Sequence, residues 1–272
     1  MATGLYFYCL REPVGTLPEI KAAAVDGEGR VTVRAFEGVE AVVSAMSMDD
    51  FGKMQTKAQE DIHWIREKAV AHEMVVEEAM GKLADRYVPV IPIRFGVIFN
   101  TDERLAEVIG GQRTAITTAF DRIRGKQEWS VKVFLADART FKNGVKEQTE
   151  GFREKSEELA SLPEGMAYFM EQELDEELER ECSRKLDEDA GRTFEDLKRF
   201  SAEAAICKIL DKELTGRSER MVLNAAYLVA DIQLLEFQDA VAKLREKLAP
   251  LGFLLEQSGP WPPYHFTEFA HE

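Results

Sequence analysis

The chain has 272 residues, of which 45% are hydrophobic, and its 50 acidic and 35 basic side chains give a formal net charge of −15. This length allows one or two domains, and the apolar content suffices for a packed core, which excludes an intrinsically disordered chain. The acidic balance argues against binding to nucleic acid or to an anionic membrane surface, because both partners require basic patches.

The cysteines and the apolar runs predict a protein of a reducing compartment. Cys9, Cys182 and Cys207 are far apart and odd in number, so they form neither a disulfide framework nor a CxxC metal or redox site. The first residues lack a basic leader, and no run approaches the roughly 20 apolar residues of a membrane-spanning helix. We therefore expect a soluble, cytoplasmic protein.

The first part of the chain predicts a small sheet followed by two helices. Apolar and alternating runs indicate strands at 5–10, 31–36 and 39–46. Apolar residues then recur at spacings of three and four, which predicts one long helix from about Thr56 to Leu83. An extended run at 88–99 contains two prolines and is expected partly at a sheet edge, and Thr101 is expected to cap a helix that continues to about Arg124.

Gly125 breaks that helix, and we place a domain boundary there, giving domains 1–125 and 126–272. A strand is predicted at 128–136, and a hairpin pairs 205–210 with 221–229. A closing helix precedes a last strand at 252–256. The order strand, helix, strand, strand, helix, strand is that of a ferredoxin-like sandwich, so the sequence predicts an α+β protein with a ferredoxin-like second domain.

An acidic segment lies inside the second domain. Between Glu147 and Asp189 there are 16 acidic and 5 basic residues. Apolar residues recur every four positions from Met170 to Leu186, which predicts a charged helix that touches the core along one narrow stripe, with a break at Gly191. Such a charge run is usually a solvated face, so we do not expect an active site in it.

No residue pattern indicates catalysis, a cofactor or a metal. His72-Glu73 begins a zinc-like motif, but Val76 stands where the second histidine is required. His72 falls on the apolar helix stripe and is expected to be a hydrogen-bonded core residue. The phosphate-binding glycine motifs and the GxSxG motif of hydrolases do not occur.

Arg94 interrupts the apolar sequence from Ile91 to Gly96. A charge among buried neighbours needs a partner, so we expect an ion pair with Glu73 or Glu77 of the preceding helix. The alternative is that Arg94 binds an anion or a carboxylate of a partner protein.

The chain ends in an unusual segment, Gly259–Phe266, which we call the C-terminal strap. Its three prolines, Pro260, Pro262 and Pro263, exclude a helix or a central strand, so the segment is expected to run extended or to turn, and it presents Trp261, Tyr264 and Phe266. The strap either covers the protein's own core or offers rigid aromatic residues to a partner. We favour self-packing slightly, and as candidate partner-binding residues we name Trp261, Pro262, Pro263, Tyr264, Phe266 and Arg94.

Several segments together resemble the gas vesicle protein GvpL/GvpF family. They occur in family order across almost the whole chain and comprise Tyr6-Phe7-Tyr8, Trp64 through His72-Glu73, Pro89 through Gly96, Glu128 through Val133, Leu223 through Val229, and the strap. The resemblance implies an accessory protein, not an enzyme, that is needed for vesicle formation. It also implies binding to the hydrophobic shell protein GvpA and to other accessory proteins, with a modified ferredoxin-like C-terminal domain.

Two functional hypotheses remain. In the first, an acidic protein holds or nucleates aggregation-prone shell subunits, covering their apolar surface while its charge keeps the complex dispersed. In the second, a ferredoxin-like module binds a small molecule or catalyses a reaction in a pocket that joins Arg94 and His72. Its sign would be a concave, water-lined site that joins these side chains, and it fails if both are buried against their own neighbours.

Overall fold

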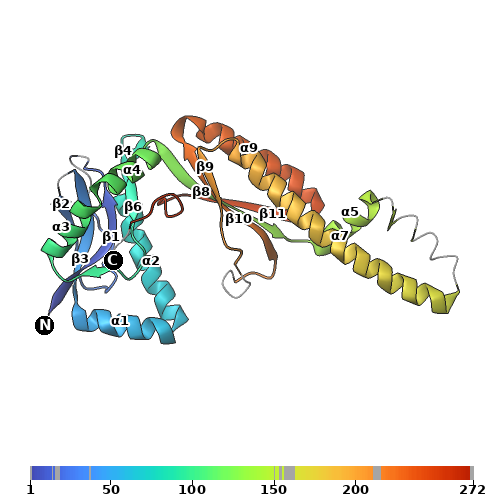
Figure 1. The fold of residues 1–272 in the computed structure, drawn as a ribbon, viewed down its shortest axis with the longest axis horizontal. Coiled ribbons are helices and arrows are strands. Elements are labelled where there is room, and N and C mark those ends of the chain that lie inside the picture. Colours follow the sequence, from blue (N-terminus) through green and yellow to red (C-terminus); the bar gives the residue numbers. More distant parts are fainter. Residues whose placement is uncertain are drawn as a thin grey trace. The chain divides into compact units, whose positions relative to one another are not determined.

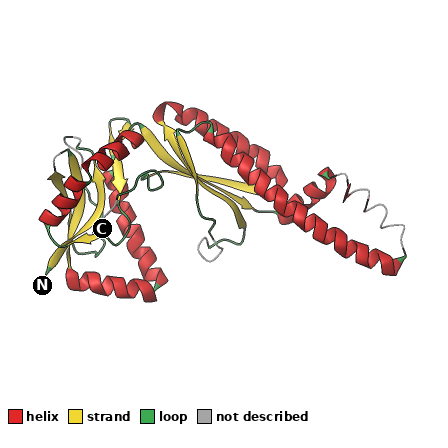
Figure 2. Cartoon of the chain, viewed as in Figure 1, coloured by secondary structure: helices red, strands yellow, loops and turns green. Residues whose placement is uncertain are grey.

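The computed structural model describes residues 2–13, 15, 19–36, 38–149, 151–152, 155, 163–210 and 216–269. It is a mixed α/β structure that divides into two compact units (Figures 1 and 2). Unit 1 comprises Met1–Glu128 and Pro260–Glu272, and unit 2 comprises Trp129–Gly259. The sequence predicts a second domain at 126–272, whereas the contacts place Pro260–Glu272 in unit 1.

Unit 1 contains a sheet in the order β2-β3-β1-β6. Its strands are β1 (Thr3–Arg11), β2 (Val31–Phe36), β3 (Val39–Ser47) and β6 (Val90–Pro92), with β7 (Ile98–Phe99) also paired to β1. Pro92 lies opposite Cys9 in an edge strand, where its missing N–H costs no ladder bond. A short hairpin is formed by β4 (Lys82–Leu83) and β5 (Arg86–Tyr87).

The helices of unit 1 are shorter than the sequence pattern predicts. The expected helix 56–83 is instead α1 (Met48–Glu60) and α2 (Ile62–Ala79), because Asp61 leaves the helical conformation and caps α2 by accepting from the backbone N–H groups of His63 and Trp64. The helix expected after Thr101 is likewise divided, into α3 (Asp102–Gly111) and α4 (Arg113–Ile123). Thr101 does cap α3, by accepting from Arg104 N–H.

Unit 2 is built on a sheet in the order β11-β8-β10-β9. Its strands are β8 (Lys126–Leu135), β9 (Glu203–Ile206), β10 (Arg220–Ala230) and β11 (Phe253–Trp261), and β9 and β10 pair antiparallel as predicted. The helices are α5 (Ala138–Gln148), α7 (Glu164–Lys198) and α9 (Leu234–Leu248). Residues of all three helices pack on β8, β10 and β11 in one apolar core.

Helix α7, gold in Figure 1, confirms the narrow apolar stripe. Leu178 and Leu186 are buried, and Leu174 and Cys182 pack beside them on the same core. The predicted break at Gly191 is wrong, because α7 continues through it to Lys198. The tertiary packing of Phe194 and Leu197 in the next turn outweighs the low helix propensity of one glycine.

Within the described residues, no helix is long and apolar enough to cross a membrane.

Gly252 offers a direct test of the unit 2 fold. Its φ is +89°, and an added Cβ would lie 2.4 Å from the backbone oxygen of Asp137. We expect Gly252→Ala to lower the free energy of unfolding by about 2 kcal/mol or more, because both the left-handed backbone and the clash penalise a side chain. Urea unfolding of the full chain measures this.

Gly191→Ala is the matched control, because that glycine is helical and nothing lies within 4 Å of its added Cβ. It should raise stability by about 0.5–1 kcal/mol. Equal effects of the two substitutions would contradict the described loop geometry.

Candidate functional site

The strap is held on unit 1 by two carboxylates. Tyr264 donates its hydroxyl to Glu73 Oε2 of α2 at 2.7 Å. Glu128, only 3% exposed, accepts from the backbone N–H of His265 at 3.1 Å and lies 2.6 Å from its Nδ1. Burial raises the pKa of Glu73 and also the pKa of Tyr264. The nearby charges of Glu77 and Glu128 raise the pKa of Glu73 further.

The apolar side chains of the strap also pack within unit 1. Phe266 is 2% exposed with the Arg122 guanidinium over its ring, and Pro262 and Pro263 are buried. Trp261 is partly buried and shares with Pro89 and Val90 a cavity of about 20 Å³, roughly the volume of one water molecule. The strap therefore packs on its own unit, and Trp261, Tyr264 and His265 retain exposed surface.

His72 lies inside unit 1, as the helix pattern predicted. It is 2% exposed, with Nδ1 3.1 Å from the Tyr6 hydroxyl and Nε2 3.0 Å from the Ile93 carbonyl oxygen. Because a carbonyl can only accept, Nε2 carries the proton and Nδ1 accepts from Tyr6. Burial lowers the pKa of His72 to about 4, so the ring is neutral at pH 7.

The ion pair expected for Arg94 is absent. Arg94 is exposed, and among the described residues no carboxylate lies within ion-pair distance of it. The chain turns at Gly96, whose φ is +90° and whose N–H donates to Tyr6, and this turn leaves Arg94 on the surface. Glu73, one of the two expected partners of Arg94, accepts a hydrogen bond from Tyr264. Among the described residues, none of the cavities is lined by both Arg94 and His72.

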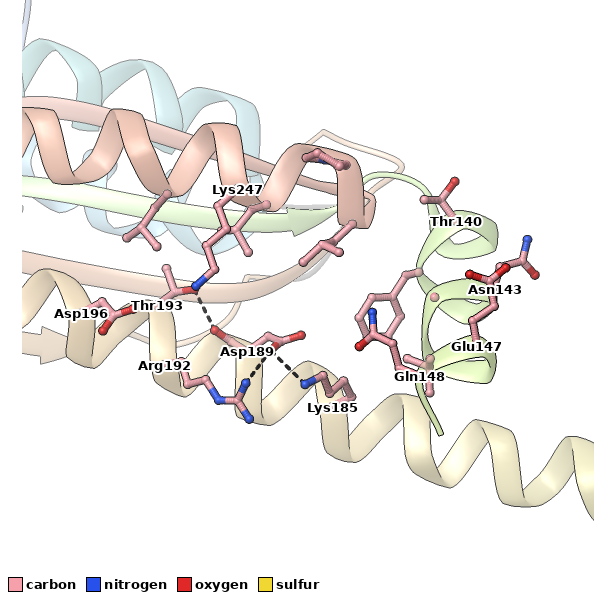
Figure 3. A pocket seen from close by; sticks show the side chains of 17 residues that line it. Thr140, Asn143, Glu147, Gln148, Lys185, Asp189, Arg192, Thr193, Asp196 and Lys247 are labelled. Carbon is pink, nitrogen blue, oxygen red and sulfur yellow. Dashed lines mark hydrogen bonds and ion pairs between the residues drawn. The ribbon is translucent and has the colours of Figure 1, made fainter. Parts of the chain in front are cut away.

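A cavity in unit 2 was not predicted from the sequence. It has a volume of about 520 Å³, is partly open to solvent, and is lined by residues of α5, α7 and α9 (Figure 3). Phe141, Leu244 and Leu248 form its apolar floor, and Lys185, Arg192 and Lys247 stand on its walls. These side chains come from three helices and lie between Phe141 and Leu248, so sequence spacing gives no signal for them.

No metal or redox centre is found in the described part of the chain. No cluster of three histidine, cysteine or carboxylate side chains there could hold a metal ion. Cys9, Cys182 and Cys207 are all free, and burial raises the pKa of the Cys9 thiol, which makes it a poor nucleophile.

Comparison with known proteins identifies one family. A family model described as gas vesicle synthesis protein GvpL/GvpF matches residues 4–268. Gas vesicle protein L of a Streptomyces species is 28% identical over 270 residues, covering 98% of this chain and 94% of that protein. Gas vesicle protein F of Haloferax mediterranei is 22% identical over 268 residues, covering 98% and 95%.

Solved structures share the fold. The crystal structure of GvpF from Anabaena sp. has a TM-score of 0.67 at 18% identity, covering 99% of this chain and 98% of that one. The GvpF structure from Microcystis aeruginosa has a TM-score of 0.65 at 19% identity, covering 97% and 99%.

The contact between Glu128 and His265 of the strap predicts that replacing Glu128 destabilises the protein. Glu128→Gln removes the charge that the two hydrogen-bonding groups of His265 face, and should lower the free energy of unfolding by about 1.5–3 kcal/mol in urea. Arg94→Ala is the control, because this exposed side chain should change stability by less than about 0.5 kcal/mol. A Glu128→Gln chain as stable as the control would show that the strap is not held by this carboxylate.

The buried His72 predicts a pH dependence. Its folded pKa of about 4 lies below the unfolded value of 6.5, so the unfolded chain binds more protons between these values. Stability should fall as pH drops from 6.5 towards 4, by at most about 3 kcal/mol. His72→Gln keeps a donor and an acceptor without titrating, so its unfolding midpoint should depend less on pH.

His63→Gln, on the exposed side of α2, should retain the pH dependence of the unmodified chain. The raised pKa of Glu73 acts in all three chains and cancels in the comparison. Parallel pH profiles for the His72 variant and the unmodified chain would contradict a neutral buried ring.

Proposed function

This chain belongs to the GvpL/GvpF family of gas vesicle synthesis proteins and has a role in gas vesicle formation, and we propose that it acts there by binding the hydrophobic shell protein GvpA and other accessory proteins without catalysing a reaction. In this role it would associate with vesicles inside the cell. The observation that best supports binding is a set of three exposed apolar side chains on α2.

Three large apolar side chains of α2 are exposed in unit 1. Ile62, Val70 and Met74 are 66%, 55% and 53% exposed. Spacings of eight and four residues place them within one 120° sector of the helix, along about 18 Å of its length. The opposite side of α2 carries His72, Val75 and Val76 into the core, so Ile62, Val70 and Met74, which we call the α2 face, are left uncovered by unit 1. The exposed polar side chains of His63, Arg66 and Glu77 lie in the same sector of the helix.

The charge of the chain suits such a partner. A shell subunit exposes apolar surface before it assembles, and an apolar face on a carrier could cover that surface. A net charge of −15 would keep the resulting complex dispersed by electrostatic repulsion. The exposed Arg94 and the exposed parts of Trp261 and Tyr264 form a second candidate contact, whereas Pro262, Pro263 and Phe266 are occupied within unit 1.

A non-catalytic role agrees with the structural contacts made by the side chains whose pKa values are shifted. His72, Tyr6 and Tyr8 are hydrogen-bonded to their own neighbours, and Glu73 holds the strap. The alternative, a reactive or ligand-binding pocket at Arg94 and His72, loses its basis because one side chain is exposed and the other buried away from it.

We also propose the ferredoxin-like class for unit 2. The sheet order β11-β8-β10-β9 and the chain order of strand, helices, two strands, helix and strand support it. This assignment describes a scaffold and does not locate a binding surface.

Serine substitution tests the α2 face. A chain carrying Ile62→Ser, Val70→Ser and Met74→Ser should keep its unfolding midpoint, because these positions are exposed, but should bind purified shell protein at least about tenfold more weakly. Pull-down and light scattering of the mixed proteins measure binding and dispersal.

Ile232→Ser with Leu235→Ser is the matched control, since these side chains of unit 2 are 93% and 81% exposed. It should bind like the unmodified chain. Absence of any complex with the unmodified chain would refute shell binding, and full binding by the triple variant would refute the α2 face.

A further inference from the structure

The unit 2 cavity has no role in the proposed binding of shell protein, and its lining suggests a separate ligand site. Its volume of about 520 Å³ falls within the roughly 300–1,000 Å³ of small-molecule sites. Its floor is formed by side chains of the unit 2 core, among them Phe141, Leu244 and Leu248. An apolar group could lie against this floor without displacing core side chains.

The cavity lining carries three cations, Lys185, Arg192 and Lys247, and three carboxylates, Glu147, Asp189 and Asp196. Asp189 of α7 has a side chain that is 16% exposed, and Lys185 Nζ and Arg192 NH1 each lie 3.7 Å from its Oδ1. Figure 3 shows these side chains with Lys247 of α9 on the adjacent wall. Among the described residues, no carboxylate lies within ion-pair distance of Lys247.

The two other carboxylates of the lining do not neutralise Lys247. Asp196 lies 3.8 Å from Arg199 on the same helix. Glu147 belongs to α5, and in Figure 3 it lies on the side of that helix turned away from Lys247. Lys185 and Arg192 are paired with Asp189, and Arg192 also with Glu188. Lys247 is therefore the cation of the lining that has no carboxylate within ion-pair distance among the described residues.

We propose that this cavity binds a carboxylate carried on an apolar stem. The carboxylate would pair with Lys247, the cation that lacks a partner, and would stay within reach of the Arg192 and Lys185 charges. The stem would cover Phe141 and Leu248. A free alkanoate and the C-terminus of an apolar peptide present the same chemistry, and a cationic amphiphile of the same length would be repelled.

The test uses the full-length chain and isothermal titration with three probes. Octanoate below its micelle concentration and acetyl-trileucine represent the free and the peptide carboxylate, and octylammonium is the charge-inverted control. At least one carboxylate probe should bind saturably with one site per chain, and octylammonium should bind at least about tenfold more weakly. The probe that binds more tightly identifies the source of the carboxylate.

Two variants locate the site. Lys247→Gln should weaken carboxylate binding at least fivefold, while Lys243→Gln, on the same helix but paired with Asp239 at 2.6 Å, should not. Both positions are exposed, so neither variant should alter the unfolding midpoint. Absence of saturable binding by both carboxylates, equal binding of octylammonium, or unchanged affinity in the Lys247 variant would each overturn the proposal.

Discussion

The attachment of the C-terminal strap to Glu73 and Glu128 is the constraint on which the rest of the structure depends. Unit 1 is made from both ends of the chain, which leaves it after Glu128 and returns at Pro260. Unit 2 is therefore an insertion in unit 1. The strands that carry the chain out and back, β8 and β11, are hydrogen-bonded neighbours in one sheet. Without the strap, Glu128 would lose both His265 groups that contact its carboxylate, at a cost of about 1.5–3 kcal/mol.

The polar interior of unit 1 fixes the orientation of α2. His72 ties the helix to Tyr6 on β1 and to the backbone of Ile93, and Tyr8 binds Ser44 and the backbone N–H of Val25. Each buried group in this chain of hydrogen bonds has a partner, and losing one would cost about 1–3 kcal/mol. The network fixes one face of α2 against the sheet. The opposite face, with Ile62, Val70 and Met74, is then presented rigidly, and a rigid face loses little conformational entropy on binding.

Periodicity predicted most of the elements but not their ends or their pairing in space. The strands at 5–10, 31–36 and 39–46, the hairpin of β9 and β10, and the burial of His72 all follow from patterns of two, three and four residues. The same patterns run across Asp61 and Gln112, where the chain leaves the helix, because apolar spacing does not record a backbone turn. Gly191 shows the opposite error, since packing keeps it helical. The exposure of Arg94, the role of Glu128 and the cavity at Lys247 depend on contacts between residues distant in sequence, which spacing cannot give.

The central claim is that the strap completes unit 1, and the most direct measurement is hydrogen exchange on a chain ending at Gly259. In that chain, the amides of β1, β3 and α2 should lose most of their protection from exchange, because Phe266 is absent and Glu73 and Glu128 lose their contacts with the strap. The amides of α9 and β10 in unit 2 should keep their protection. Unchanged protection of β1 and α2 in the shortened chain would contradict it, as would an equal loss in both units.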